Sequence, residues 1–371
     1  MALSNSCAPG GGKKILVAMS GGVDSSVALY LLQQQGYRCM GVTMRLYDNE
    51  LLGESRSSTC CSLADVEDAR QVATALGVPY YVFDFTADFE AAVIRRFAAA
   101  YAAGGTPNPC IDCNRYLKFD RLYRRARLLG CDGIATGHYA RILRDADGGY
   151  HLHTALDPAK DQSYVLYDLS QEQLAHTLFP LGELTKAQVR KIAAEQGFYN
   201  AAKQDSQDIC FVPDGDYAAF LTRYAGSAGA PGPIRDTGGR LLGRHAGLCR
   251  YTLGQRKGIG VAASAPLYVV AKDVSANTLI VGPEAALYTR AFAVQNLLWL
   301  AGAPPAAPQT LEICCRYHAR RVPVTLTPGP GDTGTGLAET PLRAVTPGQS
   351  AVFYRGTEVV AGGVFAGAAG L

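Results

Sequence analysis

The sequence predicts an α/β protein in which a parallel-sheet domain is followed by a small central domain and a C-terminal β-barrel. Three observations support this prediction. Apolar runs alternate with helical patterns in the first half of the chain, which is typical of a parallel sheet. A segment rich in glycine and proline follows, and short alternating runs fill the last part. We expect the three domains to comprise residues 1–212, 213–288 and 289–371.

The first domain begins with an apolar run at 13–19, which predicts a buried strand, and a Gly-rich turn leads into a helix ending near Gly36. Elements then alternate, with strands at 37–44, 80–85 and 132–136 and helices at 62–76, 87–103 and, after a loop at 104–112, 114–129. Asp147 and Gly148 predict a hairpin over 141–155. Thr185 and Gln188 form a capping box that opens a helix ending at Gly197.

The later part of the chain has a different texture. A helix is predicted at 216–224, residues 226–239 are rich in glycine and proline, and the runs up to about residue 286 are short. From about Phe292 onward, runs such as 311–317 and 350–354 alternate apolar and polar residues between Pro/Gly turns, which predicts the barrel.

Composition limits the class of protein. The chain has 371 residues, of which 48% are hydrophobic, and these can fill two or three domains. Neither an export signal nor an apolar run of about 18 residues occurs, so we expect a cytoplasmic protein with no membrane partner. The eleven cysteines are an odd number, which favours reduced, catalytic or metal-binding thiols over a disulfide framework.

Charge alone does not identify a partner, because the net charge is only +3. One predicted helix carries a basic run, which consists of Arg115, Lys118, Arg121, Arg124, Arg125 and Arg127. Such a run forms either a nucleic-acid-binding surface or an ordinary solvated helix face.

The sequence Ser20-Gly21-Gly22-Val23-Asp24-Ser25-Ser26 stands where the first strand passes into its helix. Glycines allow the backbone to approach a phosphate, while N–H groups, the positive helix end and serine hydroxyls donate to it. The structural alternative is a tight turn with an N-cap. The loop resembles the PP-loop of ATP pyrophosphatases, which implies an adenine nucleotide alpha hydrolase-like domain that binds ATP.

Two further segments carry cysteines. The segment Pro107-Asn108-Pro109-Cys110-Ile111-Asp112-Cys113-Asn114 brings two thiols to the start of the basic helix, where the helix end, Arg115 and Lys118 are expected to lower the thiol pKa. A zinc half-site and inert packing are the alternatives. Cys210 lies in the polar segment 205–211. An adenylating loop together with separated cysteines predicts thiolation, in which AMP is the leaving group and a persulfide supplies the sulfur.

Over nearly its whole length the chain resembles the tRNA-specific 2-thiouridylases, the MnmA/TrmU family. Besides the PP-loop and the Pro-Asn-Pro loop, the matching motifs are Ala135-Thr136-Gly137-His138-Tyr139, Lys160-Asp161-Gln162-Ser163-Tyr164, Ile209-Cys210-Phe211 and Tyr251-Thr252-Leu253-Gly254-Gln255-Arg256-Lys257-Gly258. The resemblance implies a three-domain enzyme that grips the anticodon arm of a tRNA. It would adenylate the 2-oxygen of the wobble uridine and replace that oxygen with sulfur.

The resemblance also assigns residues to both substrates. For ATP they are Ala18, Met19, Ser20, Gly21, Gly22, Val23, Asp24, Ser25, Met44 and Gly137, with Asp24 near the magnesium ion. Asn108, Pro109 and Cys110 would flank the target base once it leaves its stack. Further tRNA contacts would come from His138, Lys160, Asp161, Gln162, Arg316, Tyr317 and Gln349. The alternatives are surface charges for Lys160 and Arg316, a structural histidine for His138, and barrel packing for Tyr317 and Gln349.

By the same resemblance Cys113 is the nucleophile and Cys210 carries the persulfide, which a sulfur-carrier protein or a cysteine desulfurase would load. Either the Cys210 persulfide attacks the adenylated carbon directly, or Cys113 first releases sulfide from it. A Cys113–Cys210 disulfide bond would remain, and a cellular reductant would then reset the pair.

Cys110 departs from the family pattern, because some members carry an aspartate there with an acid–base role. Asp112 is close in sequence but offset by two residues. Cys110, Cys113 and Cys210 could instead hold three irons of a [4Fe–4S] cluster, which leaves the fourth iron for sulfide. A further alternative is a zinc site formed by Cys60 and Cys61 together with Cys110 and Cys113. Cys60 and Cys61 are adjacent in sequence, and adjacent cysteines rarely both bind one ion, which argues against this site.

Two other function classes remain open. A PP-loop ligase, such as an amidotransferase-type synthetase, would adenylate a small molecule and transfer nitrogen without needing paired thiols. A tRNA-binding protein with an inactive nucleotide loop would release no pyrophosphate from ATP.

Overall fold

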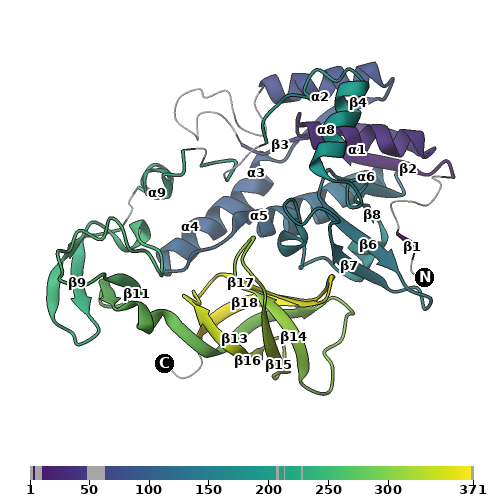
Figure 1. Ribbon diagram of the computed structural model, residues 1–371. Coiled ribbons are helices and arrows are strands. Elements are labelled where there is room, and N and C mark those ends of the chain that lie inside the picture. The colour runs from purple at the N-terminus through teal and green to yellow at the C-terminus, as the bar shows by residue number, and fades with distance from the viewer. Residues whose placement is uncertain are drawn as a thin grey trace.

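The computed structural model describes residues 3–4, 11–47, 63–205, 209–212, 214–226 and 229–368. Figure 1 shows a sheet-and-helix domain from the first half of the chain, a barrel beneath it and a small sheet beside the barrel. The predicted fold class is confirmed, because a parallel sheet, a separate central sheet and a closed barrel are all present. Among the described residues, no helix is both long and apolar enough to cross a membrane.

Five parallel strands form the sheet of the first domain, in the order β4 (Tyr80–Asp84), β3 (Arg38–Arg45), β2 (Lys14–Ala18), β5 (Gly133–Ala135) and β8 (Thr177–Leu178). Ile15 and Val17 belong to one apolar cluster and Leu16 to another, because side chains alternate between the faces of a strand. All three are buried, as expected where helices cover both faces. Four of the strands are thus predicted from sequence, whereas two residues give β8 no detectable pattern.

Helices α1 (Val23–Gln34), α2 (Leu63–Ala75) and α8 (Lys186–Glu195) pack on the face that carries Ile15 and Val17. The other face carries two long segments that each contain a π-helical stretch: α3 (Thr86–Phe89), η2 (Glu90–Ile94) and α4 (Arg95–Ala102), then α5 (Pro109–Asp112), η3 (Cys113–Arg121) and α6 (Leu122–Leu128). The predicted capping box at the start of α8 is confirmed.

The start of α5 corrects the sequence analysis, which predicts a loop up to residue 112. The helix begins at Pro109, because the Asn108 side chain accepts a hydrogen bond from the backbone N–H of Cys110 at 3.1 Å. Proline suits the first helical position, where its missing N–H has no partner to lose. Cys110 therefore lies in the first helical turn.

Six antiparallel strands close the barrel, in the order β18 (Glu358–Ala368), β13 (Tyr288–Trp299), β16 (Gly334–Arg343), β15 (Val322–Pro328), β14 (Gln309–Cys314) and β17 (Ser350–Arg355). The pairing of β17 with β18 completes the circle, so these strands leave no open edge. Phe292, Ile313 and Phe353 lie in its core. The run predicted at 311–317 ends as a strand at Cys314, and Tyr317 lies in the loop that follows.

The predicted hairpin forms as β6 (Ala140–Arg144) and β7 (Tyr150–Thr154), and β1 (Leu3–Ser4) pairs with β6. This hairpin continues the sheet of the barrel, because β7 pairs with β18 through His153 and Glu358. Two elements remote in sequence are thereby joined, and the first domain is fixed to the barrel.

The central domain contains a four-stranded sheet in the order β10 (Leu241–His245), β9 (Gly232–Asp236), β12 (Thr278–Gly282) and β11 (Tyr268–Asp273). The buried side chains of Ile234, Val269 and Leu279 give this sheet its own core. Helix α9 (Tyr217–Ala225) precedes it and is capped by Asp216, in agreement with the helix predicted at 216–224.

Candidate functional site

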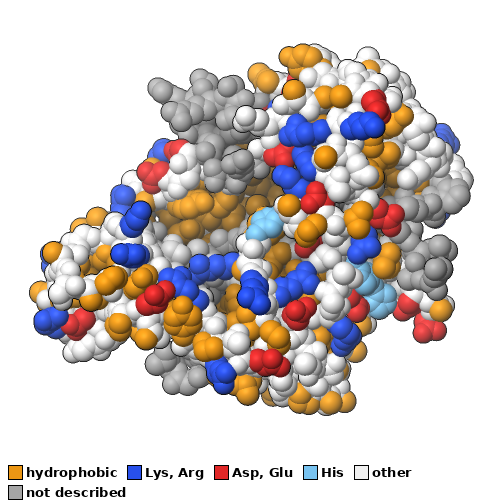
Figure 2. Space-filling model, viewed as in Figure 1, with side chains coloured by type: hydrophobic (Ala, Val, Ile, Leu, Met, Phe, Trp, Pro, Cys, Tyr) orange, Lys and Arg blue, Asp and Glu red, His pale blue; other side chains and the backbone are white. Residues whose placement is uncertain are grey.

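A cavity of about 1070 Å³ opens at the carboxyl ends of the parallel strands. Ala18 at the end of β2, Met44 near the end of β3 and Thr136 after β5 line one side of it, and Tyr317 and His318 of the barrel line another. Figure 2 shows this face of the molecule hollowed between the upper domain and the barrel, with apolar side chains inside the hollow. Ligands of open α/β sheets bind at this end of the strands.

The loop between β2 and α1 is shaped by its own serines. The backbone N–H of Ser20 donates to Ser25 Oγ at 3.2 Å, and the hydroxyls of Ser25 and Ser26 both donate to the Gly22 carbonyl at 3.1 Å. Gly22 is the N-cap of α1 and offers no side-chain acceptor to the first N–H groups of the helix. The helix end is therefore left to an anion, while these two hydroxyls fold the loop instead of donating to a phosphate.

Two glycines allow the close packing around this loop. Gly21 has a φ of +73°, and a Cβ there would lie 2.3 Å from the carbonyl oxygen of Asp65 at the start of α2. A Cβ on Gly137 would lie 2.8 Å from the backbone nitrogen of Ser25. Larger residues would push the loop, α2 and the 136–138 segment apart.

The residues expected to bind ATP lie together. The cavity is lined by Ala18, Met19, Ser20, Gly22, Val23, Asp24, Ser25, Met44 and Gly137. Gly21 differs, because its carbonyl accepts hydrogen bonds from the side chains of Asn200, at 3.0 Å, and Lys203, at 3.3 Å. Gly21 thus shapes the loop.

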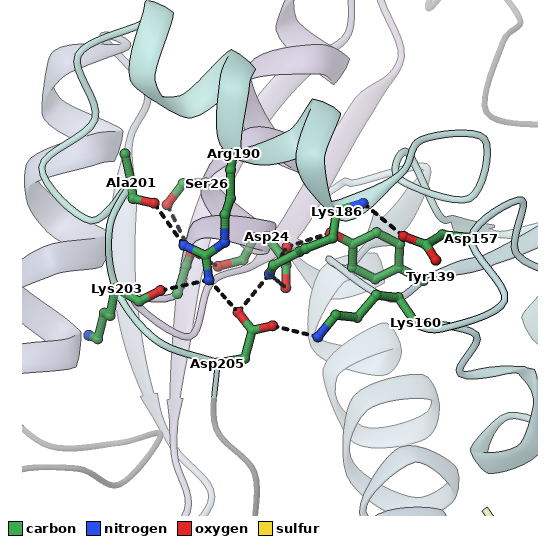
Figure 3. A network of polar contacts seen from close by, with 12 residues as sticks. Asp24, Ser26, Tyr139, Asp157, Lys160, Lys186, Arg190, Ala201, Lys203 and Asp205 are labelled. Atoms are coloured by element: carbon green, nitrogen blue, oxygen red, sulfur yellow. Dashed lines mark hydrogen bonds and ion pairs between the residues drawn. The ribbon is translucent and has the colours of Figure 1, made fainter. Parts of the chain in front are cut away.

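A network of ion pairs adjoins the loop, and motif reasoning missed it (Figure 3). The Asp24 carboxylate accepts hydrogen bonds from Lys186 Nζ, at 2.7 and 2.8 Å, and from the Tyr139 hydroxyl at 2.7 Å. Lys186 also lies 2.7 Å from Asp205. Arg190 and Lys160 reach the same Asp205 carboxylate, at 3.1 and 2.8 Å.

A fourth cation lies on the other side of the loop. Lys203 lies 2.6 Å from both Asp65 and Asp68.

Sequence spacing predicts that Lys186 and Arg190 share one face of α8, because residues four apart align on a helix. Their acidic partners are far away in sequence, so the network itself carries no local signal.

All three candidate cysteines line the cavity. Cys110 is exposed, Cys113 is 8% exposed, and Cys210 is half-buried. The Tyr47 hydroxyl donates to the Cys210 carbonyl at 3.1 Å, which holds the backbone of this segment against the end of β3. The structure thus places the loop of α1 and the three thiols around one space.

The cations expected beside the thiols are not equivalent. Arg115 forms an ion pair with Asp168 at 2.8 Å, so a carboxylate offsets much of its charge. Burial raises the pKa of Asp168 to about 6 although Arg115 opposes this shift. Lys118 lines the cavity together with Cys113. The sequence argument for a cation near the thiols therefore rests on Lys118.

His138 is a buried residue that lines the cavity. Its Nδ1 is 2.6 Å from the Thr136 hydroxyl, and its ring packs against Phe119 and Phe179. Burial, with a smaller contribution from the Lys118 charge, lowers the pKa of His138 well below its usual value. The ring is therefore neutral near pH 7 and both lines the cavity and packs in the core.

The other residues expected to contact tRNA divide into two groups. Pro109, Lys160, Gln162 and Tyr317 line the cavity, and Asn108 caps the helix beside it. Asp161 accepts hydrogen bonds from Ala155, Ser163 and the Ser163 hydroxyl, so it shapes its own turn. Arg316 donates to backbone carbonyls of Ala344 and Leu253, and Gln349 makes backbone bonds within the barrel. These last three lie outside the cavity lining.

The cysteines proposed as metal ligands fall into two groups, one at the cavity and one outside the described residues. Within the described ranges, no group of three or more His, Cys, Asp or Glu side chains is placed to hold one metal ion. Cys110, Cys113 and Cys210 share a cavity, and a cluster bound by all three stays a hypothesis, because each thiolate would bind a different iron. Cys60 and Cys61, and with them the zinc alternative, lie outside the described residues.

Comparisons with known proteins identify the family. Residues 13–214 match the family described as tRNA methyl transferase HUP domain, 218–283 the tRNA methyl transferase PRC-barrel domain, and 289–365 the aminomethyltransferase beta-barrel domain. Three similar proteins are each named tRNA-specific 2-thiouridylase MnmA. That of Magnetococcus marinus is 49% identical, over 95% of this chain and 98% of its own. Those of Chloroflexus aggregans and Geobacter metallireducens are 50% and 46% identical, over 94% and 95% of this chain and 97% and 96% of theirs. The chain therefore belongs to the family of the tRNA-specific 2-thiouridylases MnmA.

Proposed function

We propose that the chain is an ATP-dependent tRNA 2-thiouridylase, which replaces the 2-oxygen of the wobble uridine with sulfur. One observation carries the proposal. The loop between β2 and α1, which resembles a phosphate-binding PP-loop, lines the same cavity as Cys110, Cys113 and Cys210. The names of the relatives, which are 46% to 50% identical over nearly their full length, support the same reaction.

The first step would be adenylation. The 2-oxygen of the uridine attacks the α-phosphorus of ATP, a new O–P bond forms, and the bond to the β-phosphate breaks to release pyrophosphate. The N–H groups at the start of α1 are oriented to stabilise the negative charge of the phosphates. Asp24 suits the role of a magnesium ligand, because Mg²⁺ binds through one or two carboxylates together with substrate phosphates, whose charge it offsets.

The second step would transfer sulfur. The terminal sulfur of a Cys210 persulfide attacks the activated carbon, the C–O bond breaks, and AMP leaves with the oxygen. The Cys113 thiolate then attacks the inner sulfur, which leaves 2-thiouridine and a Cys113–Cys210 disulfide for a thiol reductant to reset. In the other order, Cys113 releases sulfide first and sulfide attacks the carbon. A sulfur-carrier protein or a cysteine desulfurase would supply the persulfide.

The partner would be the anticodon arm of a tRNA, and the reaction would take place in the cytoplasm. We propose that Asn108, Pro109 and Cys110 flank the flipped base, because Pro109 and Cys110 line the cavity and Asn108 caps the helix at its edge. Lys160, Gln162, His138 and Tyr317 would contact the tRNA from the cavity wall. Arg316, Asp161 and Gln349 would act from outside it, through the backbone that they hold in place.

Nucleoside analysis after incubation with tRNA tests the proposed reaction. We expect purified protein to form 2-thiouridine from undermodified tRNA, ATP–magnesium, a cysteine desulfurase with cysteine as the persulfide source, and a thiol reductant, with tRNA-dependent release of pyrophosphate. Cys113→Ser and Cys210→Ser should each abolish 2-thiouridine, whereas Cys131→Ser, a buried cysteine outside the cavity lining, should retain it. A nitrogen-transferring ligase would keep its ATP turnover in both of the first two variants, and a binding protein would release no pyrophosphate; either result would refute the proposal.

A further inference from the structure

We propose that Lys186 and Arg190 of α8, together with Lys160, form the subsite for the pyrophosphate part of ATP, and that the Asp205 carboxylate competes with phosphate oxygens for these cations. The proposal rests on the proposed function, because it assumes that ATP binds at the loop of α1. It assigns a binding role to Lys186 and Arg190, which lie outside the matching motifs, and it gives Lys160, which contacts the tRNA in the proposed function, a second role toward the phosphates.

The cations come from two separate elements and meet at one carboxylate. Asp205 Oδ1 lies 2.7 Å from Lys186 Nζ and 3.1 Å from Arg190, while Oδ2 accepts from Lys160 at 2.8 Å. These three cations share two carboxylates, those of Asp205 and Asp24, so the cluster keeps a net positive charge. A guanidinium fork and two ammonium groups form the donor set typical of phosphate sites.

The position of this cluster suits a nucleotide whose α-phosphate lies at α1. Lys186 Nζ donates to both oxygens of Asp24, which is in the first turn of α1 beside the uncapped N–H groups. Figure 3 shows Lys186, Arg190 and Lys160 directed from their elements toward the space that contains Asp24 and Asp205. Arg190, Lys160 and both carboxylates line the cavity itself.

The burial of Lys186 explains why the cluster needs an anion. Its side chain is only 12% exposed, and a buried ammonium is stable only when it is paired. Burial alone would raise the pKa of Asp205, but hydrogen bonds from Lys160 and Lys186 outweigh it and hold this pKa below its usual value. Asp205 is therefore ionised near neutral pH, and phosphate oxygens must compete with it.

A transfer of cations to the phosphates would also release Asp24. In the described arrangement Asp24 is engaged by Lys186 and Tyr139. Once Lys186 turns toward phosphate oxygens, the Asp24 carboxylate can serve the magnesium ion that accompanies them. When Lys186 moves from Asp24 to the phosphates, Asp24 becomes available to magnesium and Lys186 becomes available to the phosphate oxygens.

Binding of inorganic pyrophosphate to the full-length protein, measured by calorimetry with and without magnesium, tests this subsite. Arg190→Gln should weaken binding about tenfold or more, because it removes charged hydrogen bonds to the ligand. Arg190→Lys should recover part of the affinity, since it keeps the charge but not the fork. The matched control is Lys191→Gln on the same helix, where Lys191 is 75% exposed and pairs with Glu195; it should bind normally.

Asp205→Asn gives the opposite and more diagnostic result. Arg190 also donates to the carbonyls of Ala201 and Lys203, so its loss could act through the local fold. Removing the competing carboxylate should instead tighten pyrophosphate binding about threefold to tenfold. Unchanged or weaker binding in Asp205→Asn, or normal binding in Arg190→Gln, would overturn the subsite.

The two proposals fail separately. If pyrophosphate binds through Arg190 but no 2-thiouridine forms from tRNA, the subsite is supported and the proposed function is refuted. If 2-thiouridine forms and Arg190→Gln leaves the KM for ATP unchanged, the function is supported and the subsite is refuted.

Discussion

At the scale of single residues, the loop of α1 depends on glycine for two reasons that can be separated. Gly21 has a left-handed φ of +73° and approaches the Asp65 carbonyl closely. Gly36, at the other end of α1, has a similar φ of +82° but open space around its missing Cβ. Substitution of Gly36 therefore adds backbone strain alone, whereas substitution of Gly21 adds both backbone strain and steric overlap.

We expect Gly21→Ala to lower the free energy of unfolding by about 1–3 kcal/mol, because it adds strain and overlap at one position. It should also weaken ATP binding, since the loop must move away from α2. Gly36→Ala should cost stability through strain alone and leave ATP binding intact. Chemical unfolding and calorimetry on both variants check this, and normal ATP binding by Gly21→Ala would contradict it.

The candidate residues show what a sequence can and cannot predict at this scale. The PP-loop and the cysteines are short motifs whose chemistry is local, and the structure places both at one cavity. The partners of charged residues are not local: Asp168 offsets Arg115, and Asp205 gathers Lys160, Lys186 and Arg190. Such pairs depend on how distant segments pack, so spacing alone leaves them out.

At the scale of elements, the capping box of α8 holds the cation cluster in place. The Thr185 side chain accepts from the backbone N–H of Gln188, and Lys186 is the first helical residue after the cap. A second capping box, Ser170 with Gln173, starts α7 (Gln171–Ala175), away from the loop of α1. The two capping boxes make the same hydrogen bonds, but only that of α8 lies beside the cation cluster. Removing each cap in turn therefore separates an effect on helix stability from an effect on ligand binding.

Thr185→Ala and Ser170→Ala should each cost about 1 kcal/mol of stability, the usual value for a lost cap. Only Thr185→Ala should also weaken pyrophosphate binding, because fraying of the first turn releases Lys186. Thermal unfolding and calorimetry measure the two effects. Equal pyrophosphate affinity in both variants would show that the start of α8 takes no part in binding.

The elements themselves were predictable where their patterns are long. Strands β2 to β5 and helices α1, α2 and α8 follow apolar periodicity, Gly stops or a capping box, whereas the short elements β8 and α7 have no counterpart in the prediction. The early start of α5 depends on Asn108 as the cap and Pro109 as the first helical residue, whereas the Pro-Asn-Pro sequence by itself predicts a loop. The π-helical stretch η3 carries Cys113, and its extra residue per turn has no sequence signal.

At the scale of the whole molecule, the hairpin β6–β7 links the first domain to the barrel through His151. Its Nδ1 lies 2.7 Å from Glu358 of β18 and its Nε2 lies 2.9 Å from Asp145. Partial burial would lower the pKa of His151, but the hydrogen bonds with Asp145 and Glu358 outweigh it and raise this pKa. Charged His151 thus stabilises the junction.

Because the folded pKa is raised, the contribution of His151 is complete below its unfolded pKa, about 6.5. It is lost as pH rises through the raised folded pKa. The stability advantage of the native chain over His151→Gln should therefore be larger at pH 6 than at pH 8.5, in thermal unfolding at matched ionic strength. His153, whose pKa is lowered chiefly by burial, is the control: the advantage over His153→Gln should shrink on acidification.

The order of the three domains can be predicted from local composition and from the spacing of apolar residues. The contacts that join the domains cannot. The pairing of β7 with β18 joins residues near the middle and the end of the chain, and no periodicity reveals it. The barrel loop after β14 brings Tyr317 to the cavity of the first domain in the same way. The site is therefore a product of the whole fold, although its reactive groups are visible in the sequence.

The most direct measurement of the central claim is anaerobic 2-thiouridine formation by protein whose iron content and visible absorption are recorded on the same sample. We predict that iron-free protein, with ATP–magnesium, tRNA, and a cysteine desulfurase and cysteine as the persulfide source, forms 2-thiouridine as well as iron-loaded protein does, and that Cys210→Ser forms none. Product that appears only with iron–sulfur absorption, or that persists in Cys210→Ser, would contradict the persulfide account.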